Sequence, residues 1–443
     1  MSTSTWIITT WGILRTENDM GRRRFMLSGM GAALTVAARS AGASGALGQA
    51  AALSSPFRQA SAGSEGHPGW HRGGEGLYAP ARNLFVADRF SNFISVTDIV
   101  TGQHLATLDF GMRPQVMELA RDDAMMAVGS PEVSAIHFMN LRTGAQRRVA
   151  LPSPVYQIFF VPQSTLVAVG LRDQVGMIDY RDFSVRIFAR RFDSPRRETL
   201  LDTFYSLLFS SFSRSFWVLD EEAPRIYHRL AADDGLEGAW ETVDLSGSVS
   251  SGSGLGVGVA SPEDDLLAMT TDDGSEGLVY FPDTGKVLST GPMRTSGTTN
   301  EPMIMPYIDV YSKHVIFADM QGHVALFDLA AGGGRPERFV VDFSPRFIRS
   351  GWLEQIWILA GDRGLMFQSF GARNDRQTLR FVPEVMDIWV TGDSKTVLYS
   401  LDEGAPLVYR YDLRSRVALS PIRIRGVSMA RMLRMGSNNS ICY

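Results

Sequence analysis

Short runs of alternating apolar and polar residues recur along the chain, and the stretch from residue 84 to residue 108 sets their pattern. LFVAD, FISVTDI and HLATL read as three short strands joined by tight turns. The middle strand ends in Asp98, and Gly102 follows four residues later. An Asp side chain can cap such a turn and Gly accepts a positive φ, so the stretch predicts an antiparallel meander of three strands.

The same unit recurs about eight times, at a period of roughly 41 to 51 residues that is typical of a four-stranded propeller blade. The later copies open near residues 124, 166, 215, 266, 314, 355 and 396. In most copies the middle strand ends in Asp or Asn, namely Asp98, Asn140, Asp179, Asp328 and Asp412.

A further strand-like run precedes every copy except the first, and the run at residues 427–435 belongs to no copy. That run could return to complete the first blade, and joining both chain ends in one blade removes exposed sheet edges. The sequence therefore predicts an all-β fold: a single closed β-propeller over residues 77–435, with eight four-stranded blades. Seven blades is the alternative.

Composition narrows the functional classes. The chain has 443 residues and a net charge of -4, which gives no electrostatic case for nucleic acid. Its one cysteine, Cys442, excludes an internal disulfide, a four-thiolate iron-sulfur cluster and the Cys-x-x-Cys-His attachment of a c-type haem. A redox role would therefore need a partner that carries the redox group.

Residues 20–50 have the composition of an export signal, with a positive start, a moderately apolar run and small residues at the end. Arg22, Arg23 and Phe25 resemble the twin-arginine motif, and an ordinary Sec signal is the alternative. The apolar run is too short for a membrane anchor. We expect a periplasmic protein, with a possible upstream extension at residues 1–19, a disordered leader at 51–76 and a tail at 436–443. The true start is Met1 or Met20.

Charged residues concentrate in two sets of predicted loops that share one face of a propeller, those between blades and those between the second and third strands. Two of the loops between blades, residues 192–203 and 292–302, are unusually long, and surplus loop length on a rigid scaffold often carries binding residues. Solvated ion pairs that stabilise the ring are one interpretation. The other is a ligand-binding axial mouth formed by Arg113, Arg197, Arg294, Asn300, Glu301, Arg346, Asp173 and Asp362.

Candidate catalytic and metal-binding sets are absent from the sequence pattern. No G-x-S-x-G elbow occurs, and GLGVG at residues 254–258 lies in a strand-like context that does not suit a phosphate loop. Five of the seven histidines are scattered over different blades, and the other two, His67 and His71, lie in the leader without a helix pattern around them. We therefore expect no catalytic residues, no metal site and no cofactor of the protein's own.

The repeat, in which a strand ending ISVTD is followed by a T-G turn and LATL, resembles YVTN-type β-propellers. More loosely it resembles the non-catalytic propeller subunits of quinone-dependent amine dehydrogenases. That resemblance implies an exported subunit that holds a small partner subunit bearing a quinone, although those subunits have seven blades. Pyrroloquinoline-quinone dehydrogenases are a poorer match, because no Trp follows the T-G turns at the spacing of their docking motif.

The leading hypothesis is thus an exported, non-catalytic scaffold subunit of an amine-dehydrogenase-like oxidoreductase. The alternative is a propeller that handles a small anionic ligand, a tetrapyrrole such as d1 haem or a sugar acid, at an arginine-lined mouth. A metal-delivery protein is a third possibility. Whether the chain is itself an enzyme stays open at this point.

Overall fold

The computed structural model describes residues 79, 82–120, 125–161, 164–171, 174–189, 207–210, 212–232, 235–236, 239–261, 265–294, 302–309, 311–330, 332, 334–351, 355–370, 375–381 and 383–436. The predicted export signal, leader and tail, apart from residue 436, lie outside them. In the described part of the chain, no helix has the length and apolar character that a membrane crossing requires.

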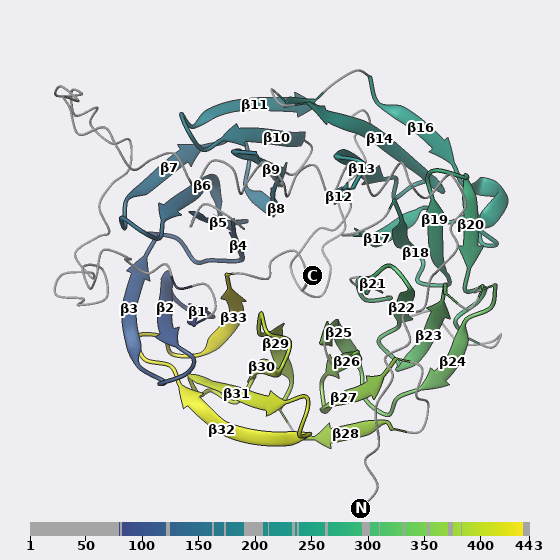
Figure 1. The fold of residues 1–443 in the computed structure, drawn as a ribbon. Coiled ribbons are helices and arrows are strands. Elements are labelled where there is room, and N and C mark those ends of the chain that lie inside the picture. The colour runs from purple at the N-terminus through teal and green to yellow at the C-terminus, as the bar shows by residue number, and fades with distance from the viewer. Residues whose placement is uncertain are drawn as a thin grey trace, which may run out of the picture. The chain divides into compact units, whose positions relative to one another are not determined.

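Eight antiparallel sheets form a closed ring, as predicted (Figure 1). From innermost to outermost strand, the first four blades are β33(Ala430–Met435), β1(Asn83–Asp88), β2(Phe93–Asp98), β3(His104–Asp109); β4(Val116–Leu119), β5(Met125–Ser130), β6(Val133–Asn140), β7(Gln146–Ala150); β8(Val155–Phe160), β9(Leu166–Leu171), β10(Gln174–Asp179), β11(Ser184–Ala189); and β12(Leu207–Ser210), β13(Ser215–Leu219), β14(Arg225–Ala232), with both β15(Gly235–Leu236) and β16(Glu241–Asp244) paired to β14.

The remaining four blades are β17(Leu255–Ala260), β18(Leu267–Thr271), β19(Gly277–Phe281), β20(Lys286–Ser289); β21(Tyr307–Ile308), β22(His314–Ala318), β23(His323–Asp328), β24(Glu337–Val340); β25(Pro345–Gly351), β26(Ile356–Gly361), β27(Gly364–Ser369), β28(Gln377–Arg380); and β29(Val385–Val390), β30(Thr396–Leu401), β31(Leu407–Asp412), β32(Val417–Arg423). A short 3-10 turn, η2(Ser246–Ser248), precedes the fifth blade.

The ring closes through the C-terminal strand, which confirms the predicted role of residues 427–435. Strand β33 pairs with β1 in antiparallel register, with Phe85 opposite Arg434. The carboxylate of Asp88 at the end of β1 then accepts hydrogen bonds from the Met429 amide at 3.0 Å and the Ser428 hydroxyl at 2.8 Å. The first blade is therefore assembled from both ends of the propeller.

The predicted turns also have the expected chemistry. Asp98 Oδ1 accepts hydrogen bonds from the backbone amides of Val100 and Thr101, and Gly102 has a φ of 70°. Asn140 makes the same bonds ahead of Gly144, whose φ is 75°. Each of these turns is therefore determined locally by an Asp or Asn side chain and a glycine.

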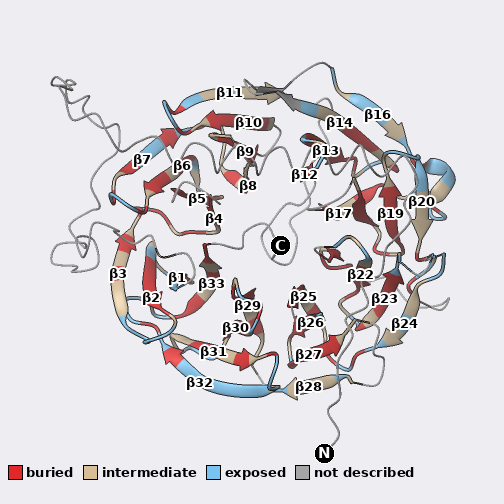
Figure 2. Ribbon diagram, in the orientation of Figure 1, coloured by how far each residue is buried: buried red, intermediate tan, exposed pale blue. Residues whose placement is uncertain are grey.

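The hydrophobic core is a ring of inter-blade clusters. Buried side chains of every blade pack against those of the next blade, from the cluster shared by the first and second blades to the one shared by the eighth and first. Burial is concentrated toward the axis, and the outermost strands such as β32 are largely exposed (Figure 2). Loss of one blade would therefore expose the apolar faces of two neighbours.

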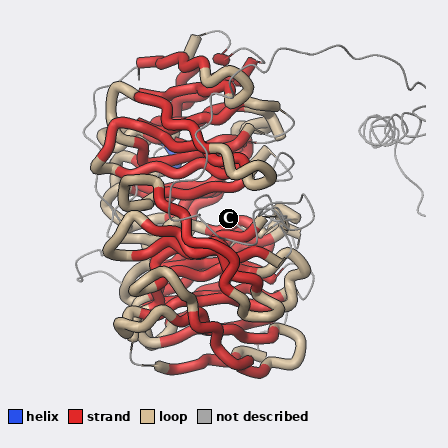
Figure 3. Tube along the Cα trace, turned by 90° about the vertical axis from the view of Figure 1, so that its left-hand side faces the viewer, coloured by secondary structure: helices blue, strands red, loops and turns tan. Residues whose placement is uncertain are grey.

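Loops gather on the two faces of this ring (Figure 3). We call face 1 the side with the loops that join one blade to the next and the loops between second and third strands. Face 2 carries the loops between first and second strands and between third and fourth strands. The sequence placed the candidate mouth on face 1.

Candidate functional site

The predicted arginines on face 1 form ion pairs with acids of their own blade or the next one. Arg294 Nε lies 3.0 Å from Asp319 Oδ2, and both side chains are buried. The Asp319 carboxylate also faces His323 Nδ1 at 2.9 Å. Arg113 pairs with Glu132 in the same way across the second blade. These contacts fasten the loop that enters a blade to the hairpin between its second and third strands.

Two other predicted residues fasten loops on the same face. Arg346 Nη1 lies 2.5 Å from Glu384 Oε1 and so joins the seventh blade to the eighth. Asp362 Oδ1 accepts a hydrogen bond from the Ser344 amide at 2.7 Å. The described part of the predicted mouth thus makes the structural contacts foreseen in the ion-pair interpretation, and ligand binding by it stays a prediction. The remaining predicted residues, Arg197, Asn300, Glu301 and Asp173, lie outside the described residues, as does most of each long loop.

A second charged set lies at the axis of the ring, where the sequence did not place one. In each blade, the innermost strand has one residue opposite the third residue of the second strand. We call these eight residues the axial girdle: Arg434, Glu118, Phe159, Leu208, Gly258, Tyr307, Arg349 and Trp389.

The axial girdle has a charged sector and an apolar sector. Arg349, Arg434 and Glu118 come from the seventh, first and second blades, and Trp389 of the eighth blade lies between the two arginines in ring order. The third to sixth blades contribute Phe159, Leu208, Gly258 and Tyr307, which are apolar apart from the tyrosine hydroxyl. Leu208, Tyr307 and Trp389 are buried in the clusters between blades, so the apolar sector has accessible surface at Phe159, and a ligand that combines a charged with an apolar part suits this division.

Arg434 joins three innermost strands. Its Nη1 donates to Asp387 Oδ2 of β29 at 3.1 Å, and its Nε donates to the Met117 carbonyl of β4 at 3.1 Å. The guanidinium also lies over Trp389, 4.9 Å from the ring centroid. Asp387 follows a bulge in β29 and accepts a further hydrogen bond, from the Leu433 amide at 2.8 Å. Asp387 and Arg434 are therefore committed to holding the closing strand.

Glu118 and Arg349 are less fully engaged. Glu118 Oε1 meets Arg434 Nε only at 3.5 Å, and the side chain keeps 29% of its surface accessible. Protein surrounds it nonetheless, and this burial raises the pKa of Glu118; Arg434 and Arg349 oppose the rise, and Asp387 adds to it. Arg349 is buried and donates from Nη1 to the Ile348 carbonyl at 2.9 Å, while its Nε has no acceptor among the described residues.

Sequence reasoning missed the charged sector because its members are far apart in the chain. The available signal was an ionisable residue inside an otherwise apolar innermost strand, as in VMEL, PRFIRSG, VMDIWV and ARMLRM. Among the described residues, no group of three or more His, Cys, Asp or Glu side chains is arranged to hold a metal ion.

Comparison with known proteins supports the fold and goes no further. No protein-family model and no curated protein matches the sequence. Among solved structures, the dihydro-haem d1 dehydrogenase NirN in complex with DHE is similar, with a TM-score of 0.63 and 14% identity over 82% of this chain and 77% of that one. A functionally unknown protein from Desulfotomaculum acetoxidans is also similar, with a TM-score of 0.51 and 9% identity over 80% of this chain and 99% of that one. Saccharomyces cerevisiae Sqt1 is similar as well, with a TM-score of 0.53 and 12% identity over 72% of this chain and 86% of that one. Identities this low show a β-propeller and do not show a function.

Proposed function

We propose that this chain is an exported binding propeller that holds a small amphipathic anion at the axial girdle. The observation that carries the proposal is Arg349, a buried guanidinium whose Nε has no acceptor among the described residues. A buried guanidinium N–H group without an acceptor is costly, so a ligand carboxylate that accepts from Arg349 would bind with a gain in free energy.

The neighbouring groups favour the same ligand class. Because its pKa is raised, Glu118 takes up a proton more readily than an ordinary glutamate, and a protonated carboxyl can donate a hydrogen bond to an anion. Phe159 of the third blade is half-buried and provides apolar surface at the same level of the ring, whereas Trp389 and Tyr307 are buried in the clusters between blades. The anion-handling function suggested by the sequence is thus retained, but its proposed site moves from the rim to the axis. NirN, a similar propeller, was solved with the compound DHE, and a carboxylated tetrapyrrole is accordingly our first probe.

The test is an absorbance titration of the purified full-length chain with protoporphyrin IX, a planar apolar dicarboxylate. We expect saturable binding at one site. Arg349→Met should weaken it about 10- to 150-fold, the range that corresponds to a hydrogen bond with a charged group. Arg423→Met, on an exposed residue of the outermost strand β32, is the matched control and should leave the affinity unchanged. Absence of binding, or equal affinity in wild type and Arg349→Met, would contradict the proposal.

The scaffold function of an amine-dehydrogenase-like large subunit is the competing proposal, and one surface observation favours it. Phe90, between β1 and β2 on face 1, is 65% exposed, and the Arg89 guanidinium lies 5.4 Å from its ring centroid. Arg89 Nη1 also contacts Asp402 Oδ2 of the eighth blade at 2.7 Å, which holds this pair in place. Aromatic and arginine side chains are enriched at protein interfaces.

Purification of the chain from its own periplasm tests this second function. A small subunit with a quinone chromophore should co-purify and should be lost in Phe90→Ala. Phe212→Ala, which removes an exposed phenylalanine from face 2, should retain it. A preparation without a companion subunit would contradict the scaffold function and leave the ligand-binding proposal intact.

A further inference from the structure

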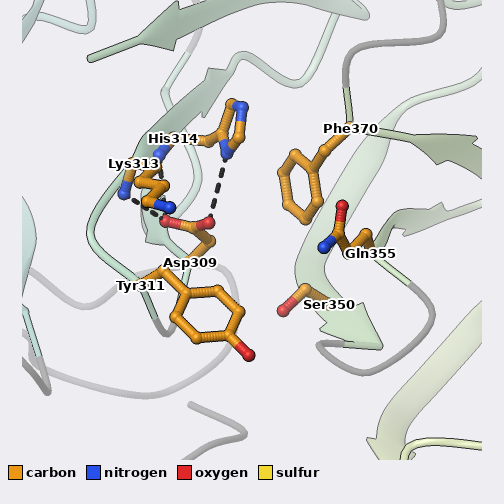
Figure 4. A pocket seen from close by; sticks show the side chains of 7 residues that line it. All are labelled: Asp309, Tyr311, Lys313, His314, Ser350, Gln355 and Phe370. Carbon is orange, nitrogen blue, oxygen red and sulfur yellow. Dashed lines mark hydrogen bonds and ion pairs between the residues drawn. The ribbon is translucent and has the colours of Figure 1, made fainter. Parts of the chain in front are cut away.

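A pocket on face 2 between the sixth and seventh blades contains a histidine that the fold does not need. It has a volume of about 170 Å³ and is lined by Asp309, Tyr311, Lys313, His314, Ser350, Gln355 and Phe370 (Figure 4). Its residues come from the loop between β21 and β22, the end of β25, and the loops that flank β26 and β27. The pocket is thus built from two blades and lies outside the predicted mouth.

An Asp–His pair forms the wall of the pocket. Asp309 is buried, and its Oδ1 accepts hydrogen bonds from the backbone amides of Lys313 at 2.6 Å and His314 at 2.9 Å. Its Oδ2 lies 3.1 Å from His314 Nδ1 (Figure 4). An ionised carboxylate only accepts, so Nδ1 is protonated and Nε2 of the neutral ring is left as an acceptor.

The histidine ring is held in place from the other blade. Phe370 stacks on His314 with 4.3 Å between ring centroids and 23° between the ring planes. His314 Nε2 makes no hydrogen bond with any described residue. An oriented ring with an unused acceptor is the arrangement that a ligand hydroxyl or N–H group requires.

The eighth blade shows that the loop does not depend on this histidine. There Ser394, Lys395 and Thr396 occupy the places of Ser312, Lys313 and His314, and Ser394 has a φ of 57° where Ser312 has 54°. That loop closes through Thr391 and Asp393, with no imidazole. His314 therefore adds a functional group to a turn that folds without one.

The charge of the pocket indicates what else the ligand carries. Lys313 is a lining cation, with Nζ 5.6 Å from the Tyr311 ring centroid, whereas the one lining carboxylate, Asp309, is occupied by its three contacts. A carboxylate near Lys313 and a hydroxyl near His314 Nε2 satisfy both groups. We propose that this pocket binds a small hydroxycarboxylate, with the hydroxyl donating to His314 and the carboxylate facing Lys313.

The test uses the full-length chain with 15N-labelled histidine and three probes: lactate, propionate without the hydroxyl, and 1,2-propanediol without the carboxylate. Lactate should shift the Nε2 resonance of His314 and bind about tenfold more tightly than propionate, and propanediol should not bind. Equal binding of lactate and propionate, or no shift of His314 at saturating lactate, would overturn the proposal.

Variants separate the two roles. His314→Phe retains an aromatic ring against Phe370 and should abolish the preference for lactate over propionate. Lys313→Met retains the apolar stem and should weaken both acids by a similar factor of about ten, while the blade-eight counterpart Lys395→Met should weaken neither. A lactate preference that survives in His314→Phe would refute the role of Nε2 as the acceptor of the ligand hydroxyl. The resonance shift in the wild type tests the site even where a variant folds poorly.

Discussion

Replacement of Arg434 by methionine should destabilise the propeller more than the same replacement of an exposed arginine. The side chains of Arg434 and Asp387 are 15% and 9% exposed, so their ion pair is largely removed from water. Removing one partner of such a pair costs about 3–5 kcal/mol, because the other charge is left buried. Here the variant also leaves Glu118 without its arginine and the Met117 carbonyl without a donor.

This loss of unfolding free energy corresponds to a decrease in the melting temperature, Tm. The roughly 350 residues from β1 to β33 unfold with an entropy of about 2.1 cal/mol/K per residue, or about 0.7 kcal/mol/K in total. A loss of about 3–5 kcal/mol therefore corresponds to a decrease in Tm of about 4–7 °C. Differential scanning calorimetry at pH 7 measures it directly.

Two controls make this result specific. Arg423→Met, on the exposed outer strand, should change Tm by less than about 1 °C. Because Asp387 contacts Arg434, the double variant Arg434→Met/Asp387→Asn should lose less stability than the sum of the two single variants. A Tm for Arg434→Met within 1 °C of the Arg423→Met value, or strict additivity in the double variant, would refute the view that Arg434 joins three innermost strands.

Three further predictions concern pH and export. The raised pKa of Glu118 means that the folded state holds this proton more tightly than the unfolded state, so the free energy of unfolding decreases as the pH rises above 4.5. Urea unfolding of Glu118→Gln should lack that decrease. Parallel pH profiles of the wild type and Glu118→Gln would contradict this prediction. Burial raises the pKa of Asp88, but hydrogen bonds from Ser91, Met429 and Ser428 outweigh it and hold the pKa below 3.8. Asp88→Asn should therefore cost about 1–3 kcal/mol at pH 7 and progressively less as the pH falls below 3.8, whereas a constant difference would count against this role. Lysine at positions 22–24 should retain the protein in the cytoplasm on cell fractionation, and normal export would eliminate the twin-arginine route.

The sequence predicts local features of this fold well because short segments determine them. Asp98 and Gly102 form their turn within five residues, and the pairing of β33 with β1 follows from one leftover apolar run. The axial girdle depends on the register of eight separate sheets. A bulge between Val385 and Asp387 sets Asp387 opposite Ser400, where its carboxylate accepts a hydrogen bond from the Leu433 amide, and no sequence pattern reveals such a bulge.

The pocket on face 2 escaped prediction for a related reason. Asp309 and His314 are five residues apart and could have been paired from the sequence, but Phe370 and Ser350 reach them only because the seventh blade packs beside the sixth.

For the rim arginines, the sequence predicted the position but not the partners. Their loops were placed on the correct face, while their partners, such as Asp319 for Arg294, depend on how each entering loop folds back on its own blade.

The proposal that the axial girdle holds an anionic ligand is tested most directly by native mass spectrometry of the protein purified from its own host. We predict a mass above that of the polypeptide alone by one non-covalently bound small acid, which is retained in Arg423→Met and lost in Arg349→Met. A wild-type mass equal to that of the chain alone, or a bound molecule that Arg349→Met retains in full, would contradict the account.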